Sequence, residues 1–124
     1  MKKNKLSPLA WQVTQEKGTE PPFSGEYDHF FESGKYHCIC CDSLLFKSDH
    51  KFDSGCGWPA FYQAIEENTI EKEDTSHGMI RTEVLCKNCN AHLGHKFPDG
   101  PYGTRYCINS VAMEFKADTD SSEN

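Results

Sequence analysis

The sequence predicts a small, mainly β protein: an antiparallel sandwich or barrel with a little helix near the N-terminus. Two observations support this prediction. From about residue 35 onward, apolar residues recur at every second position in several short segments, which is the period of a half-buried strand. Gly, Pro and Asp separate these segments, as turn residues do between antiparallel strands.

The chain is predicted to form one domain. Its 124 residues leave little room for a second hydrophobic core. We expect a single domain over 1–124, with a core at about 8–116 and a disordered acidic tail at about 117–124, because polar chain ends without apolar partners fray.

A short helix is expected over residues 8–17. Ser7 is a good N-cap, Pro8 suits the first helical turn, and Gly18 suits a helix stop. Leu9 and Val13 lie one turn apart and give this helix an apolar side.

The strands are expected to be short and numerous. The candidates are 35–38, 44–46, 69–74, 79–85, 91–97, 104–109 and 111–115. Alternation predicts which side chains share a face of the sheet. One face is expected to carry Ile80, Thr82 and Val84. In the last strand, the side chains expected to point inward are Val111, Met113 and Phe115.

Charge and hydropathy argue against two classes of partner. The chain has 13 Lys and Arg against 19 Asp and Glu, a formal net charge of −6, and no basic stripe, so nucleic-acid binding is not expected. No apolar run approaches the ~18 residues that a membrane span requires. Residues 1–8 are positively charged but no apolar stretch follows them, so we expect no secretory signal and a cytoplasmic location. A monomer is expected because the domain is small and acidic.

Two Cys-x-x-Cys pairs predict a metal site. Cys38 and Cys41 form one pair, and Cys86 and Cys89 form the other. Two such turns aim four sulfurs at one ion at ~2.3 Å and complete the tetrahedral shell of a structural zinc site. Cys40 competes with Cys41 as a ligand, but it lies only one residue from Cys38. The alternative is two redox-active pairs, although neither has the βαβ setting of a thioredoxin-like motif.

Two further cysteines stand in different contexts. Cys56 lies in a stretch too rich in Gly and Pro for regular structure, which places its thiol on a loop. Cys107 lies in a candidate strand in which Arg105, Cys107 and Asn109 share one face while Tyr106 and Ile108 face the core. A cation near a thiol favours the reactive thiolate. The alternative for either cysteine is a small buried core residue.

His92 and His95 are candidate acid–base groups. On a regular strand, residues three apart point to opposite faces, so the two imidazoles converge only if Gly94 allows a bulge. Converging imidazoles would serve as acid and base near pH 7. The alternative is a role near the metal, since His92 follows Cys89 by three residues.

Five segments, in chain order, resemble the motifs of a known family. They are residues 19–25 (TEPPFSG), 52–61 (FDSGCGWPAF), 76–79 (SHGM), 86–100 (CKNCNAHLGHKFPDG) and 105–110 (RYCINS). The chain closely resembles B-type methionine sulfoxide reductases, which reduce methionine-R-sulfoxide, from about residue 9 to 116. The resemblance implies a pair of antiparallel sheets, arranged like a β-sandwich, with short N-terminal helices.

The resemblance also implies a role for each residue singled out above. Cys107 matches the catalytic cysteine and Cys56 the recycling cysteine. The residues that match the ligands of one structural zinc ion per chain are Cys38, Cys41, Cys86 and Cys89. Around the substrate, Trp58 matches the indole that receives the S-methyl group, and Arg105 is a further expected contact. The polar groups near the sulfoxide oxygen match His92, His95 and Asn109.

The chemistry implied is reduction by two thiols. Cys107 attacks the sulfoxide sulfur while His92 or His95 supplies a proton to the oxygen. Cys107 becomes a sulfenic acid, which condenses with Cys56. The resemblance implies that the substrates are oxidised proteins or peptides and that thioredoxin reduces the disulfide.

The chain departs from the family pattern at two places. The loop over 99–104 looks shorter than usual, which affects the rim of the substrate groove, and Ala60 replaces the more familiar serine. Neither change removes a residue that matches a catalytic one.

Two other classes of function compete with the reductase. A non-catalytic, zinc-stabilised protein-binding module is one, but such a module has no need of two further thiols. A Cys/His acyl-transfer enzyme with Cys107 as nucleophile is the other, but acyl transfer does not use a second thiol such as Cys56.

Overall fold

A computed structural model describes residues 6–28, 30–75, 78 and 80–117. Ser76, His77 and Met79, which form most of one motif matched above, lie outside the described residues. So does 118–124 of the expected tail, while Ala117 is the last residue of a strand.

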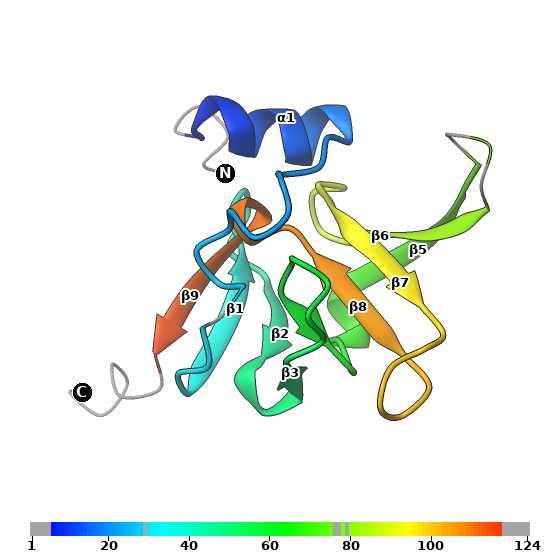
Figure 1. Cartoon of the computed structure of the whole chain (residues 1–124). Helices are drawn as coiled ribbons and strands as arrows, with labels where there is room; N and C mark the ends of the chain where they lie inside the picture. Colours follow the sequence, from blue (N-terminus) through cyan, green and yellow to red (C-terminus); the bar gives the residue numbers. More distant parts are fainter. Residues whose placement is uncertain (1–5, 29, 76–77, 79, 118–124) are drawn as a thin grey trace.

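Nine strands form two antiparallel sheets in the described part of the chain (Figure 1). In chain order the elements are α1 (Pro8–Glu16), β1 (Gly34–Cys38), β2 (Leu44–Lys47), η2 (Ser48–His50), β3 (Lys51–Phe52), β4 (Ala60–Phe61), η3 (Glu66–Asn68), β5 (Thr69–Asp74), β6 (Arg81–Cys86), β7 (His92–Phe97), β8 (Arg105–Ile108), η5 (Ser110–Ala112) and β9 (Met113–Ala117). The smaller sheet has the order β2-β1-β9, and the larger β3-β4-β8-β7-β6-β5. The expected mainly β class with two antiparallel sheets is confirmed.

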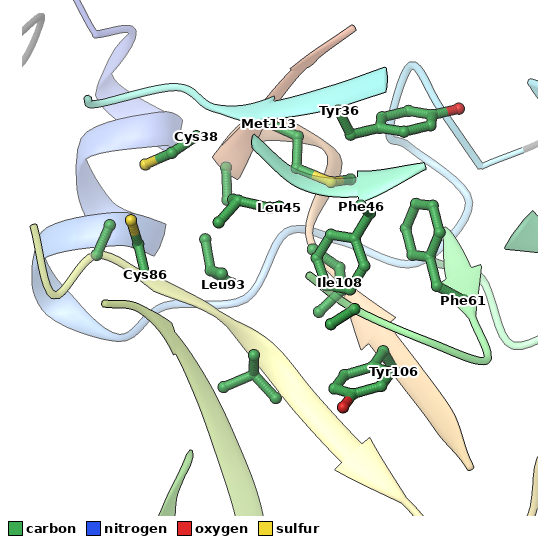
Figure 2. Packing of buried hydrophobic residues seen from close by; sticks show 14 of the residues in the cluster. Tyr36, Cys38, Leu45, Phe46, Phe61, Cys86, Leu93, Tyr106, Ile108 and Met113 are labelled. Atoms are coloured by element: carbon green, nitrogen blue, oxygen red, sulfur yellow. The ribbon is translucent and has the colours of Figure 1, made fainter. Parts of the chain in front are cut away.

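The hydrophobic core joins the two sheets. Tyr36 and Phe46 of the smaller sheet meet Phe61 and Tyr106 of the larger one, as Figure 2 shows. The Phe46 and Phe61 rings stack at 4.4 Å, and Tyr36 meets Phe61 edge-on at 5.2 Å. Each such aromatic pair adds roughly 0.5–1.5 kcal/mol beyond the area it buries. Ile108 is fully buried beside them, so Tyr106 and Ile108 face the core as the alternation of this strand predicts.

The helix begins as expected but ends differently. The Ser7 hydroxyl accepts a hydrogen bond from the Ala10 amide at 3.1 Å, and Pro8 stands in the first turn. Lys17, rather than Gly18, takes the left-handed conformation that ends the helix, with φ of 59°. The helix packs against β7 and η5. Several short N-terminal helices were expected. Within the described residues there is one α-helix, and the other helical segments are three-residue 3-10 turns.

Two of the expected strand faces are wrong at their ends. Ile80 precedes β6 and is 78% exposed, while Val84 is fully buried. Val111 lies in the 3-10 turn η5, so the last strand starts at Met113. Both errors fall where alternation continues past the last backbone pairing, because the period of two holds only while the strand is paired.

An irregularity in β7 shapes the sheet near its centre. Val84 pairs with Gly94 and Leu85 with His92, so Leu93 is an extra residue between them. A Cβ atom on Gly94 would lie 2.1 Å from the Cys107 carbonyl oxygen, so only glycine lets β8 approach this closely. The bulge that the two histidines require is therefore present.

Within the described residues, the structure contains no helix that combines the length and the hydrophobicity needed to cross a membrane.

Candidate active site and metal centre

The two Cys-x-x-Cys turns have the same backbone geometry. In each, the residue after the second cysteine is left-handed: Asp42 with φ of 71° and Asn90 with φ of 63°. Its amide donates to the carbonyl of the first cysteine, at 2.9 Å in the Cys38 turn and 2.7 Å in the Cys86 turn. Asp and Asn tolerate this conformation better than most residues. One turn joins β1 to β2 and the other joins β6 to β7, so the turns come from different sheets.

The four sulfurs of these turns fit a tetrahedral metal ion. The Sγ atoms of Cys38, Cys41, Cys86 and Cys89 lie within 4.8 Å of one another. Cys38 and Cys89 are 3.6 Å apart, and Cys41 and Cys86 are 3.5 Å apart, close to the about 3.8 Å edge of a tetrahedral zinc–thiolate shell. Cys40 is buried outside the four, and the Gln15 amide lies 3.5 Å from its sulfur.

The ionisation of these thiols also suits a cation. The hydrogen bond from Cys38 lowers the pKa of Cys86 to about 5, whereas burial raises the pKa of Cys89 to about 12. Thiols crowded in this way resist joint ionisation until a cation offsets their charge.

Cys56 and Cys107 lie side by side, although 51 residues separate them in the chain. Their Sγ atoms are 3.4 Å apart. Cys107 is in β8 and pairs with Ala60 of β4, and the loop that carries Cys56 leads directly into β4. Gly55 and Gly57 of this loop have φ of 72° and 97°, a region that glycine enters without strain.

The two thiols titrate as one pair. Their mutual hydrogen bond lowers the pKa of Cys56 to about 5, while the same bond, followed by burial, raises the pKa of Cys107. Near neutral pH the pair therefore holds one proton and one negative charge, with the charge on Cys56 in this arrangement. Arg105 lowers the pKa of both thiols.

Arg105 is held by a carboxylate that sequence analysis did not find. Its Nε and Nη2 donate to the two oxygens of Asp99 at 2.8 and 3.2 Å, and its guanidinium stacks 4.4 Å from the centre of the Phe97 ring. The side-by-side contact with Arg105 lowers the pKa of Asp99. Asp99 lies in the loop that looked short, where no pattern indicated which side chain would face the arginine.

A hydrogen-bonded group built around Glu20 holds Trp58 and Asn109. The Trp58 indole Nε1 donates to the Glu20 carbonyl at 3.0 Å, and the Glu20 amide donates to Asn109 Oδ1 at 2.9 Å. Asn109 Nδ2 in turn donates to the Leu93 carbonyl at 2.9 Å. Asn109 follows the end of β8 and is buried, yet it lines the same pocket as Cys107. The Asn109 side chain thus links the segment that carries Glu20 to β7, which carries Leu93.

The two histidines converge, and each contacts a buried carboxylate. Their ring centres are 5.4 Å apart. His92 Nδ1 lies 2.8 Å from Glu83 Oε2, and His95 Nε2 lies 2.8 Å from Asp74 Oδ2. Burial lowers the pKa of His92, which favours its neutral imidazole. Glu83 and Asp74 were not predicted. Alternation places Glu83 on the face opposite the buried Val84, and a carboxylate on the same face as a histidine of the paired strand is the signal that could have found it.

A small pocket of about 80 Å³ opens beside Cys107. Its lining residues are Thr19, Trp58, Arg81, Gly94, His95, Phe97, Cys107 and Asn109. His92 is 2% exposed and is not among them. A larger cavity of about 420 Å³ lies between the helix and η5, but it is lined by none of the predicted catalytic or metal-binding residues.

Comparison with known proteins agrees with this arrangement of sulfur, indole and imidazole. The SelR domain family matches residues 6–117. A peptide methionine sulfoxide reductase MsrB of Thioalkalivibrio sulfidiphilus is 58% identical over 118 residues, which cover 93% of this chain and 86% of the relative. The proteins of the same name from Pseudomonas putida and Pseudomonas entomophila are 62% and 63% identical over 114 residues, covering 90% of this chain and 86% and 87% of the relatives.

The fold and the paired thiols define a thiol-dependent oxidoreductase with a separate four-cysteine metal site. The chain belongs to the SelR domain family, so the predicted resemblance to B-type methionine sulfoxide reductases is confirmed.

The shared proton of the thiol pair leads to a testable change in reactivity. Cys107→Ala removes the main cause of the low pKa of Cys56, so the pKa of Cys56 should rise toward its ordinary value. In the reduced wild-type protein, labelling of Cys56 by iodoacetamide should persist down to about pH 5, and in the variant the midpoint should move to higher pH. Peptide mass spectrometry across pH measures the midpoint; an unchanged midpoint would contradict the shared proton.

Proposed function

We propose that this protein reduces methionine-R-sulfoxide in proteins to methionine with Cys107 as nucleophile and Cys56 as recycling thiol. The proposal depends on one observation: the Cys107 sulfur lies 3.4 Å from that of Cys56, and Cys107 lines a pocket together with an indole and an imidazole. The relatives that share the fold are named for this activity.

The first step is attack by the Cys107 thiolate on the sulfoxide sulfur. Cys107 shares its proton with Cys56, so the Cys56 sulfur is positioned to accept that proton as Cys107 attacks. The sulfoxide oxygen must gain a proton before the S–O bond breaks, and the imidazole that lines the pocket is that of His95. Methionine leaves, and Cys107 retains the oxygen as a sulfenic acid.

The second step needs little movement. The Cys107 sulfenic acid condenses with Cys56, a Cys107–Cys56 disulfide forms, and the oxygen leaves as water. A sulfur–sulfur bond is about 2.0 Å long, and the sulfurs start 3.4 Å apart on a glycine-rich loop and a strand end. External dithiol then reduces the disulfide; in the cell we assign this role to thioredoxin, following the family.

The walls of the pocket account for recognition of one sulfoxide epimer. Trp58 lines the pocket with an indole that is fixed through Nε1, and this apolar ring suits the S-methyl group. His95, with the remaining N–H of Asn109, offers polar contact to the oxygen. Because the methyl group and the oxygen then occupy different walls, the other epimer would place its oxygen against the indole.

We assign structural zinc to the four-cysteine site. Cys38, Cys41, Cys86 and Cys89 would hold the ion as a closed thiolate shell, without an open position for substrate. Bound zinc supplies no chemistry to the reduction there; it links the turn of one sheet to the turn of the other. We further propose that the protein is a single-domain monomer, because the chain is short and acidic. We place it in the cytoplasm, where cysteines stay reduced.

The roles of the two thiols differ in a single turnover. Without an added reductant, wild-type protein and Cys56→Ser should each convert about one sulfoxide per chain, because Cys56 is oxidised only in the second step, after methionine has left. Cys107→Ser should convert none. With thioredoxin, thioredoxin reductase and NADPH, only the wild type should turn over repeatedly. Methionine is quantified by chromatography, and equal single-turnover loss in both variants would overturn the assignment.

The metal should contribute much of the stability. Removal of zinc by a chelator, verified by elemental analysis, should lower the melting temperature by more than about 10 °C, since losing only a few kcal/mol shifts the midpoint that far in a small domain. Zinc, but not magnesium, should restore it. A melting curve unchanged after verified removal would refute a structural role.

A further inference from the structure

We propose that Asp74 is a positioning residue for the reduction step and that it fixes His95 as the group that protonates the sulfoxide oxygen. The inference deepens the function proposed above and rests on it. It assigns a role to a carboxylate at the end of β5, two strands away from β7.

The register of the larger sheet brings Asp74 to His95. Asp74 pairs with Arg81 of β6, and Glu83, two residues further along β6, pairs with His95 of β7. Paired residues share a face, as do residues two apart on one strand. His95 pairs with Cys107 of β8, so the carboxylate, the imidazole and the nucleophilic sulfur all belong to one face of the sheet.

The contact itself is buried and specific. Asp74 is 5% exposed, and its Oδ2 lies 2.8 Å from His95 Nε2 and 3.3 Å from Arg81 Nη2. A carboxylate that accepts from Nε2 sets that nitrogen as the one that carries hydrogen. Nδ1 is then the ring nitrogen left for a ligand in the pocket that His95 lines. Arg81 stabilises the negative charge on Asp74.

The second histidine has a different environment. His92 Nδ1 is bound to Glu83, whose other oxygen pairs with Lys17 Nζ at 3.3 Å. Its buried Nε2 has no hydrogen-bond partner among the residues that the structure describes, and the residue does not line the pocket. His92 therefore packs behind His95, and the structure distinguishes two imidazoles that the sequence left equivalent.

The proton and electron balance follows from this arrangement. The donor is the imidazolium form of His95, which carries a second proton on Nδ1 while Nε2–H stays on Asp74. As Cys107 attacks, the Nδ1 proton passes to the sulfoxide oxygen, and two electrons pass from Cys107 to the substrate sulfur. The S–O bond of the substrate breaks and the hydroxyl group is kept as Cys107 sulfenic acid. His95 is left neutral with Nε2–H still on Asp74, and a proton from solvent restores it.

The contact can be tested in the wild-type protein before any variant is made. Nitrogen-15 histidine spectra at alkaline pH, where an imidazole is neutral, report which ring nitrogen carries hydrogen; a His95→Asn variant assigns the resonance. We expect hydrogen on Nε2 of His95. Hydrogen on Nδ1 would overturn the proposal, whatever the activity of the protein.

The kinetic test is Asp74→Asn, which keeps the size of the side chain and removes its charge. The rate of the reduction step in single turnover should fall about 10- to 100-fold, within the usual range for acid catalysis, with KM changed by less than about threefold. Asp74→Glu, which keeps the charge, should recover part of the loss.

Glu73→Gln is the matched control. Glu73 is the preceding residue of the same strand and is exposed, so it undergoes the same chemical change outside the pocket and should leave the rate unchanged. A rate for Asp74→Asn equal to that of Glu73→Gln would overturn the inference and leave the proposed function standing. A wild-type protein without activity on the R epimer would instead refute the function, and if Asp74→Asn fails to fold, the wild-type spectra decide.

Discussion

The site depends on one pairing register in the larger sheet. Cys107 lies opposite Ala60 on one side and His95 on the other. β8 therefore places the proposed nucleophile between the strand that follows the Cys56 loop and the strand that carries His95. Gly94 is part of this constraint, because a side chain there would meet the Cys107 carbonyl at 2.1 Å. A slip of one residue in β8 would turn Cys107 toward the core and Tyr106 toward the pocket.

The metal centre and the thiol pair use cysteine in opposite ways. In the metal centre four sulfurs from turns of two sheets form a closed set with matched backbone geometry, which suits stability and offers no open coordination position. In the thiol pair two sulfurs share one proton beside Arg105, which suits reactivity. The first set comes from one turn of each sheet, and Cys107 of the second lies on the face of the larger sheet that carries the pocket.

Local patterns predicted part of this structure. Cys-x-x-Cys spacing indicated the metal ligands, alternation placed Tyr106 and Ile108 inward, and Ser7 capped the helix as expected. The partners Asp74, Glu83 and Asp99 were missed because each contact depends on strand register or loop path across the fold, which no short segment encodes. Lys17 ending the helix in place of Gly18 is a smaller error of the same kind, since the hydrogen bonds at the helix end outweigh the local preference for glycine.

The proposed reaction uses one thiol pair to reduce one epimer of methionine sulfoxide. The most direct measurement is incubation of the protein with a peptide that contains racemic methionine sulfoxide, with dithiothreitol as reductant and the two epimers resolved by chromatography. Loss of the R epimer alone is the result expected from a pocket with separate methyl and oxygen walls. Persistence of both epimers with folded, zinc-loaded protein would contradict the account, and loss of both at similar rates would contradict the assignment of the walls.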